Sequence, residues 1–125
     1  MNETRYTEDH QWLQLDETGE VVVGITGYAQ EQLGDIVFVE LPAVGTDVAS
    51  GDEIAVVESV KAASDIRAAL SGEISAVNER LADEPELINA DPEGDGWFFK
   101  MTVDDETTLA GFMDEDSYKE LIKQA

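Results

Sequence analysis

The sequence predicts a mainly β protein, a sandwich or barrel-like fold with short helices at its periphery. Short apolar runs rich in valine, isoleucine and phenylalanine recur from residue 12 to residue 103, as expected for strands. Turns that contain glycine separate many of these runs at close intervals, a spacing typical of sandwiches and barrels. With 125 residues, of which 42% are hydrophobic, the chain is expected to form one domain with its own core.

The first elements are predicted to be a hairpin and a helix. The segments "WLQLD" and "VVVGI" flank the turn "ETGE", so we expect two paired strands between residues 12 and 25. Thr26 is the expected N-cap of a short helix over "TGYAQEQLG", in which Ala29 and Leu33 share one face. Gly34 is the expected terminator, because glycine tolerates the left-handed conformation that commonly ends a helix.

The rest of the chain is predicted to form further strands and then helices. The expected strands are "DIVFVEL", "SGDEIAVVES", "ASDIRAAL", "EISAVNERL" after a turn at Ser71–Gly72, and "DGWFFKMTV". Two acidic helical segments follow, "DDETTLAGF" and "DEDSYKELIKQ", the second with Tyr118, Leu121 and Ile122 on one side. We therefore expect one domain over residues 1–125, with a core from about 10 to 103 and a helical segment from about 104 to 124.

Acidic residues dominate the charge. The chain has 29 Asp and Glu against 7 Lys and Arg, a net charge of −22. Such a surface repels phosphate backbones and anionic lipids, which argues against nucleic-acid and membrane partners. Because the acids are spread along the chain, the charge favours adaptation to a high-salt cytosol; docking onto basic partners is the alternative. The N-terminus has no apolar stretch and no apolar run approaches a membrane span, so we expect a cytoplasmic protein.

The sequence offers no complete catalytic or metal-binding motif. It has no cysteine, which excludes disulfides, thiolate metal sites and thiol nucleophiles. Residues 91–96 imitate the opening of a calcium-binding loop, but Thr102 stands where a bidentate glutamate is needed. His10 is the only histidine, and no serine lies in a recognisable nucleophile context, so a hydrolase triad has no support. We expect a protein that is not an enzyme.

Lys61 is the residue that stands out. It lies in "AVVESVKAASDI", at the apex of an expected hairpin, although the chain has few lysines. Its neighbours Val60, Ala62 and Ala63 are uncharged. A hairpin apex with small flanking residues exposes the amine and leaves room for an enzyme to bind it. That setting suits covalent attachment of a prosthetic group; a Schiff-base lysine needs desolvation to lower its pKa.

The segment "VVESVKAASDI" resembles the lipoylation segment of the glycine cleavage system H protein. "HQWLQL", "VGITGYAQEQLGDIVFVELPAVG" and "SGEISAVNERLADEPELINADPEGDGW" agree as well, in collinear order from about His10 to Leu121. The resemblance implies a barrel-sandwich hybrid, as in lipoyl and biotinyl carriers, with residues 1–125 as a single lipoyl-carrier domain. It further implies lipoate in amide linkage on Lys61, with Glu58 and Asp65 as candidate recognition residues.

The resemblance also implies a carrier that serves several enzymes. A pyridoxal-phosphate glycine decarboxylase loads an aminomethyl group onto the lipoyl disulfide. An aminomethyltransferase then passes the one-carbon unit to tetrahydrofolate, and a dihydrolipoyl dehydrogenase reoxidises the dithiol with NAD. A lipoate ligase or lipoyl transferase would attach the arm, and we expect a monomer. The lack of cysteine fits this role, because the protein has no thiol to exchange with the lipoyl sulfurs.

Two positions depart from the family pattern. An acidic residue commonly follows the histidine of the first segment and is associated with holding the loaded amine, but here that position is Gln11. Some members carry a histidine where this chain has Gln32. His10 and Asp65 do match positions of the arm cleft.

Four alternatives remain open from the sequence. Biotin acceptors usually have methionine on both sides of the lysine, unlike Val60 and Ala62 here. Lipoyl domains of 2-oxo-acid dehydrogenases are shorter and tethered by a linker, which this chain lacks. An H-like protein for lipoate relay or redox signalling and an unmodified acidic interaction module are the other two.

Overall fold

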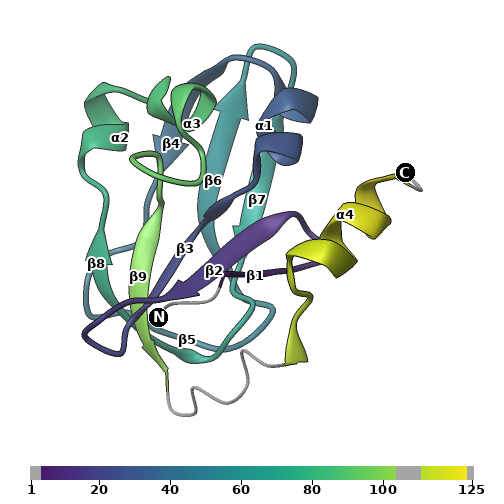
Figure 1. Cartoon of the computed structure of the whole chain (residues 1–125). Helices are drawn as coiled ribbons and strands as arrows, with labels where there is room; N and C mark the ends of the chain where they lie inside the picture. The colour runs from purple at the N-terminus through teal and green to yellow at the C-terminus, as the bar shows by residue number, and fades with distance from the viewer. Residues whose placement is uncertain (1–3, 104–110, 124–125) are drawn as a thin grey trace.

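The computed structural model describes residues 4–103 and 111–123, which form two antiparallel sheets. The larger sheet has the strand order β1-β2-β3-β9-β8-β5, and the smaller has the order β4-β6-β7 (Figure 1). The strands are β1 (Thr4–Tyr6), β2 (Gln11–Leu15), β3 (Val21–Ile25), β4 (Ile36–Glu40), β5 (Asp47–Val48), β6 (Glu53–Ser59), β7 (Ala63–Arg67), β8 (Gly72–Val77) and β9 (Phe99–Val103). This arrangement confirms the predicted mainly β fold.

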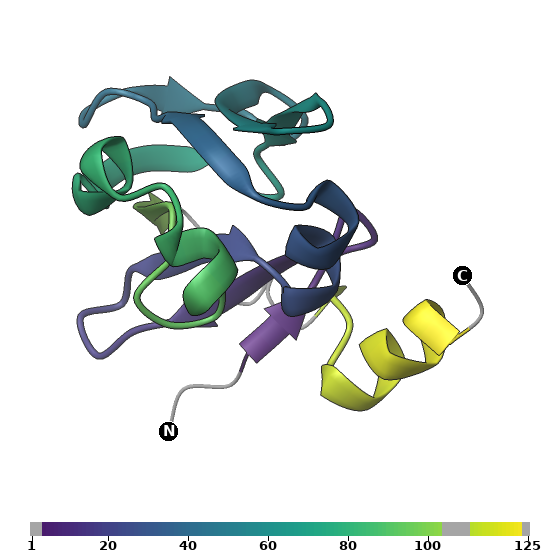
Figure 2. The same ribbon diagram turned by 90° about the horizontal axis from the view of Figure 1, so that it is seen from above.

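Short helices lie at the ends and sides of the sheets (Figures 1 and 2). They are α1 (Gly27–Leu33), α2 (Arg80–Asp83), α3 (Leu87–Ala90) and α4 (Glu115–Lys123). In the described part of the chain, no helix is long and apolar enough to cross a membrane. The N-cap of α1 is Thr26, whose hydroxyl accepts a bond from the Ala29 N–H, and its C-cap is Gly34, both as predicted.

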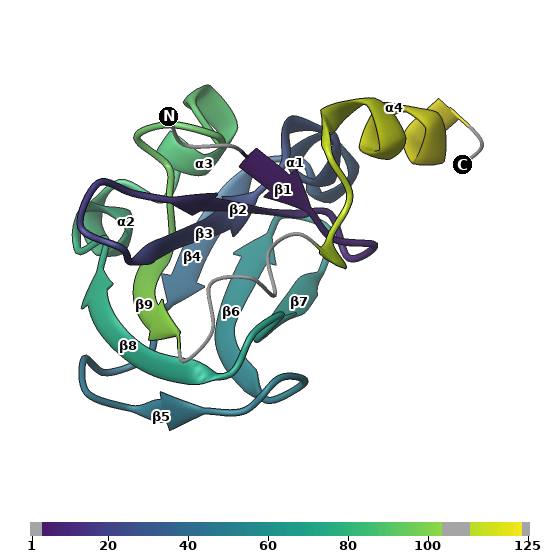
Figure 3. The same cartoon turned by 60° about the horizontal axis from the view of Figure 1, so that its bottom comes forward.

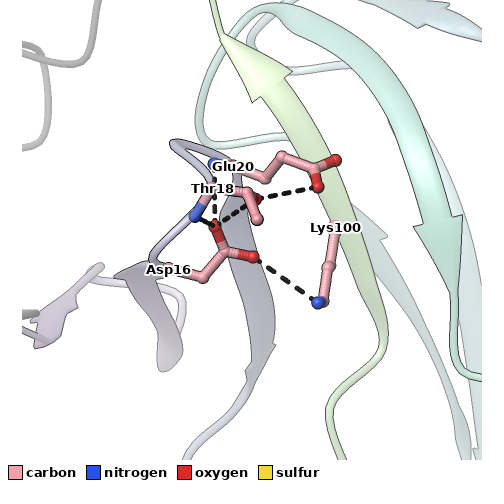
Figure 4. Close-up of polar contacts among 4 residues, drawn as sticks. All are labelled: Asp16, Thr18, Glu20 and Lys100. Carbon is pink, nitrogen blue, oxygen red and sulfur yellow. Dashed lines mark hydrogen bonds and ion pairs between the residues drawn. The ribbon is translucent and has the colours of Figure 1, made fainter.

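The hairpin of β2 and β3 shows how local sequence fixes a turn. The Asp16 carboxylate accepts hydrogen bonds from the N–H of Thr18 (2.9 Å), the hydroxyl of Thr18 (2.6 Å) and the N–H of Glu20 (3.0 Å; Figure 4). The Lys100 Nζ on β9 lies 3.5 Å from the other carboxylate oxygen. The hydroxyl of Thr18 contributes most to lowering the pKa of Asp16, assisted by the two backbone N–H groups and Lys100. The charged form of Asp16 therefore closes the predicted turn.

The main core fills the space between the two sheets. Inward-facing side chains from both sheets are buried there, among them Leu13, Val23, Val57, Ile66, Ile74, Phe99 and Met101. A second, smaller cluster consists of Tyr6, Trp12 and Tyr118, and it fastens α4 to β1 and β2. Figure 3 shows α4 projecting beyond the sheets beside α1, and this cluster is one of its attachments to the domain.

The structure corrects several predicted boundaries. β8 ends at Val77, whereas the sequence predicted a strand through Leu81. The Asn78 side chain donates hydrogen bonds to the carbonyl oxygens of Asp95 and Trp97, both at 2.8 Å, and the chain then turns into α2, which buries Leu81 completely. The strands β1 and β5 and the helices α2 and α3 were not predicted. The expected helix 104–112 falls mostly outside the described residues, whereas α4 confirms the second helical segment.

Candidate functional site

Lys61 lies in the tight connection between β6 and β7, as the sequence predicted (Figure 1). The Ser59 N–H donates to the Ala62 carbonyl (2.8 Å), which closes the turn. The Ser59 hydroxyl oxygen accepts bonds from the N–H groups of Lys61 and Ala62, both at 3.1 Å. Ser59 thus sets the shape of the apex. Its place two residues before the lysine is a signal for such a turn that the sequence analysis missed.

The stem of Lys61 lies against Gly34, the C-cap of α1. A Cβ atom added to Gly34 would lie 3.3 Å from Cε of Lys61 and 3.7 Å from its Nζ. Gly34 also has a φ of +84°, which other residues rarely adopt. Glycine is therefore favoured here both by the helix end and by the passage of the lysine stem. A hydrogen bond from the Val60 N–H to the Asp35 carbonyl, at 3.0 Å, joins the apex to the same corner.

Asn89 of α3 holds this corner in place. Its side-chain amide donates to the Gly34 carbonyl (2.9 Å) and to Oε1 of Gln30 (2.8 Å). Its side-chain oxygen accepts a bond from the Ile36 N–H at 2.8 Å. One side chain thus links α3 to the end of α1 and the start of β4, the corner against which the Lys61 stem lies. The sequence analysis did not identify Asn89.

Glu58 and Asp65 lie on the exposed face of the smaller sheet, on the two strands that Lys61 connects. Glu58 pairs with Ala63 across the hairpin, and Asp65 pairs with Val56. Because Val56 and Glu58 are two residues apart on β6, the two carboxylates point to the same side of the sheet. Both residues are exposed, so they are available to a partner.

The histidine of the predicted arm cleft lies at the other end of α1 from Lys61. The ring of His10 packs against Tyr28 with centroids 4.8 Å apart. Its Nδ1 lies 2.8 Å from the hydroxyl of Tyr118, which in turn lies 2.7 Å from Oγ1 of Thr26. His10 therefore helps to bind α4 to the N-terminal end of α1. Gln32 is exposed on α1.

Gln11 joins the two sheets. It is buried, with 3% of its surface exposed, and its Nε2 donates to the Arg67 carbonyl at 2.8 Å. Its Oε1 is also buried and has no hydrogen-bond partner among the described residues. The structure therefore brings Lys61, Glu58 and Asp65 together at one hairpin and places His10 and Gln11 elsewhere in the fold.

Comparisons with known proteins agree with this architecture. A family model described as glycine cleavage H-protein matches residues 4–125. The glycine cleavage system H protein of Bartonella quintana is 58% identical over 123 residues, covering 98% of this chain and 99% of that protein. The corresponding protein of Cronobacter sakazakii is 53% identical over 122 residues, covering 98% and 95%.

A solved structure supports the same assignment. The crystal structure of a glycine cleavage system H protein from Mycobacterium marinum superposes with a TM-score of 0.87 at 36% identity, covering 97% of each chain. The family match spans the described sheets and the lysine-bearing hairpin alike. The chain therefore belongs to the glycine cleavage H-protein family, as its resemblance around Lys61 predicted.

Proposed function

We propose that this chain carries its lipoyl arm on Lys61. H proteins are the non-catalytic lipoyl carriers of the glycine cleavage system, and they hold lipoate on a lysine through an amide. The observation that favours Lys61 is its setting at an exposed hairpin apex. Lys100, Lys119 and Lys123 each have a carboxylate oxygen within 4 Å, whereas Lys61 has none among the described residues.

The residues around Lys61 fit the attachment of a long arm. Amide formation removes the charge of the amine, and no described carboxylate has to give up an ion pair when that happens. Ser59 keeps the apex in a tight turn, and Gly34 leaves room for the lysine stem. When attached, the lipoyl group supplies a disulfide that accepts the aminomethyl group. The chain itself has no cysteine that could exchange with that disulfide.

The carrier works with the decarboxylase and the aminomethyltransferase of the glycine cleavage system. We infer three further features: reoxidation by dihydrolipoyl dehydrogenase, arm attachment by a lipoate ligase or lipoyl transferase, and a monomeric single domain in the cytoplasm. Glu58 and Asp65 are the proposed recognition residues, because both lie on the exposed face of the hairpin that bears Lys61. A visiting arm acts through effective concentration, so no tight complex is needed.

Lipoylation of the purified apo-protein tests the attachment site. We expect a lipoate ligase with ATP and lipoate to modify the wild type once, at Lys61, as read by peptide mass spectrometry. Lys61→Arg should stay folded and unmodified, and Lys119→Arg, the matched control on α4, should be modified like the wild type. Lipoate on Lys100, or its continued attachment to Lys61→Arg, would contradict the assignment.

A second assay tests the role of the loaded protein. With the decarboxylase, the lipoylated protein should support exchange of the glycine carboxyl carbon with bicarbonate, whereas the unlipoylated protein should not. Equal exchange by both forms would refute the role of the arm. Normal lipoylation without any exchange would favour lipoate relay.

A further inference from the structure

Exposed apolar side chains gather beside the lysine-bearing hairpin. In the described chain, the exposed large hydrophobic residues are Val37 (53%), Phe38 (50%), Val44 (61%) and Val60 (66%). Val60 precedes Lys61 and donates its N–H to the Asp35 carbonyl, so it borders the start of β4. Val37 and Phe38 lie on β4 itself, whereas Val44 lies apart, in the connection to β5. Val37, Phe38 and Val60 thus lie on or next to the start of β4.

An irregularity in β4 creates part of this exposure. The pairing of β4 with β6 shifts register between Ile36 and Phe38. Side chains alternate in a regular strand, so with Val39 buried the side chain of Val37, two residues earlier, would also face the core. The bulge turns Val37 outward while Ile36 and Val39 stay buried. Two consecutive apolar side chains are therefore presented to the outside.

Phe38 lies on the same sheet face as the two proposed recognition carboxylates. Phe38 is the register partner of Glu58 on β6, and Glu40 is the partner of Val56. The outer face of β4, β6 and β7 consequently has two cross-strand rows: Phe38–Glu58–Ala63 and Glu40–Val56–Asp65. Figure 2 shows these strands at the top of the view, with no helix of the described chain above them.

We propose that this outer face is the docking surface for the enzyme that attaches the lipoyl arm, with Phe38 as its apolar anchor; the inference rests on the proposed role of Lys61. On this surface the aromatic ring of Phe38, on the edge strand β4, lies among the carboxylates of Glu40, Glu58 and Asp65, one on each strand. The partner surface that fits it is an apolar recess flanked by lysine or arginine side chains. Buried aromatic anchors with a polar rim are the usual composition of binding hot spots.

We assign this surface to the attaching enzyme because, of the enzymes that use the arm, it must come closest to Lys61. It must form an amide bond at the Lys61 Nζ itself, whose stem lies against Gly34 at the base of the apex. Its active-site surface therefore contacts Val60 and the adjoining sheet face. Enzymes that act after attachment meet the sulfurs at the far end of the arm, so they need no such contact with this face.

The rate of lipoylation tests the anchor. Purified apo-proteins are modified by a lipoate ligase with ATP and lipoate, and kcat and KM for the protein substrate are measured. Phe38→Thr, which keeps a strand-forming side chain, should lower kcat/KM roughly thirtyfold, mostly through KM, as expected for a hot-spot anchor. Phe38→Leu should recover much of this loss. Val44→Thr removes an apolar side chain that is even more exposed but lies elsewhere, and it should stay within about twofold of the wild type.

Three outcomes would overturn the proposal. Phe38→Thr and Val44→Thr could behave alike, or Phe38→Thr could match the wild type while retaining its melting temperature. Alternatively, Phe38→Thr that has been fully lipoylated at high enzyme concentration could lose glycine–bicarbonate exchange as strongly as it loses lipoylation, and the decarboxylase would then be the occupant. A wild type that is not modified on Lys61 would instead refute the proposed function, so the two failures are distinguishable.

Discussion

Replacing Asn89 should loosen the corner on which the lysine-bearing hairpin rests. Asn89→Ala removes three hydrogen bonds, two to oxygen acceptors and one from the N–H of Ile36, a residue with only 4% of its surface exposed. Each bond contributes about 1 kcal/mol net. Because Asn89 is only partly buried, water replaces some of them, and we expect the free energy of unfolding to fall by about 2–3 kcal/mol.

Asn89→Asp separates hydrogen bonding from volume. Aspartate still accepts the Ile36 N–H, but at neutral pH its carboxylate faces the oxygen atoms of Gly34 and Gln30, to which asparagine donates. It should destabilise at least as much as alanine at pH 7. This repulsion raises the pKa of the new carboxyl in the folded state, so the loss should shrink as the pH falls and the protonated group regains a donor.

Urea unfolding gives the global effect, and amide hydrogen exchange gives the local one. The amide of Val60, bonded to Asp35, should exchange faster under native conditions in Asn89→Ala than in the wild type. Asn78→Ala is the matched control, because the Asn78 side-chain amide also donates two hydrogen bonds but, among the described residues, makes none to this corner. It should lower stability without selectively exposing Val60. A loss below about 0.5 kcal/mol, within the range of ordinary surface substitutions, or equal Val60 exchange in both variants, would refute the reasoning.

Four other predictions follow from particular contacts. Burial, assisted by Glu93, raises the pKa of Tyr6 to about 12, whereas an unfolded tyrosine titrates near 10. The stability of the folded state should therefore decline between pH 10 and 12, and Tyr6→Phe should flatten that decline in thermal melts. The pKa of Asp16 is lowered, chiefly by Thr18, so its stabilisation is present above the unfolded value and lost in acid, and Asp16→Asn should show a shallower acid limb. Gly34→Ala should cost about 1–3 kcal/mol in urea unfolding, because φ of 84° and ψ of −155° are open essentially to glycine alone and the Lys61 stem lies close by. With a net charge of −22, the melting temperature should climb steeply from millimolar to molar KCl, and much less in a near-neutral H protein; parallel curves would instead favour docking to basic partners.

Elements with local signals could be predicted from the sequence. The two cap residues of α1 form hydrogen bonds with residues three or four positions away, Thr26 with Ala29 and Gly34 with Gln30. Both caps were therefore identifiable from local spacing alone. The turn closed by Asp16 is equally local. The strands β1 and β5, with three and two residues, are too short to show an alternating pattern. The end of β8 depends on hydrogen bonds from the Asn78 side chain to the carbonyl oxygens of Asp95 and Trp97. These residues are 17 and 19 positions further along the chain, so no local sequence pattern contains them.

The candidate site divides in the same way. Lys61 and its hairpin were predictable because the turn, the small neighbours and the family resemblance occupy one contiguous segment. The corner against which the lysine stem lies was not predictable. It depends on Gly34, Asp35 and Asn89, which come near the apex only through tertiary contacts. The bulge that exposes Val37 was likewise invisible, since "DIVFVEL" alone reads as a regular strand.

Gln11 shows how a departure from the family pattern acquires a physical meaning. A carboxylate at this position could not donate to the Arg67 carbonyl, so the present link between β2 and β7 requires the amide. The amide oxygen remains buried without a partner among the described residues, and it is a neutral acceptor. An ammonium group that reached it would gain one hydrogen bond but no opposite charge. Because hydrogen bonds between a charged donor and a charged acceptor are stronger than those to a neutral oxygen, any hold of Gln11 on a loaded amine is weaker than that of an acid in its place.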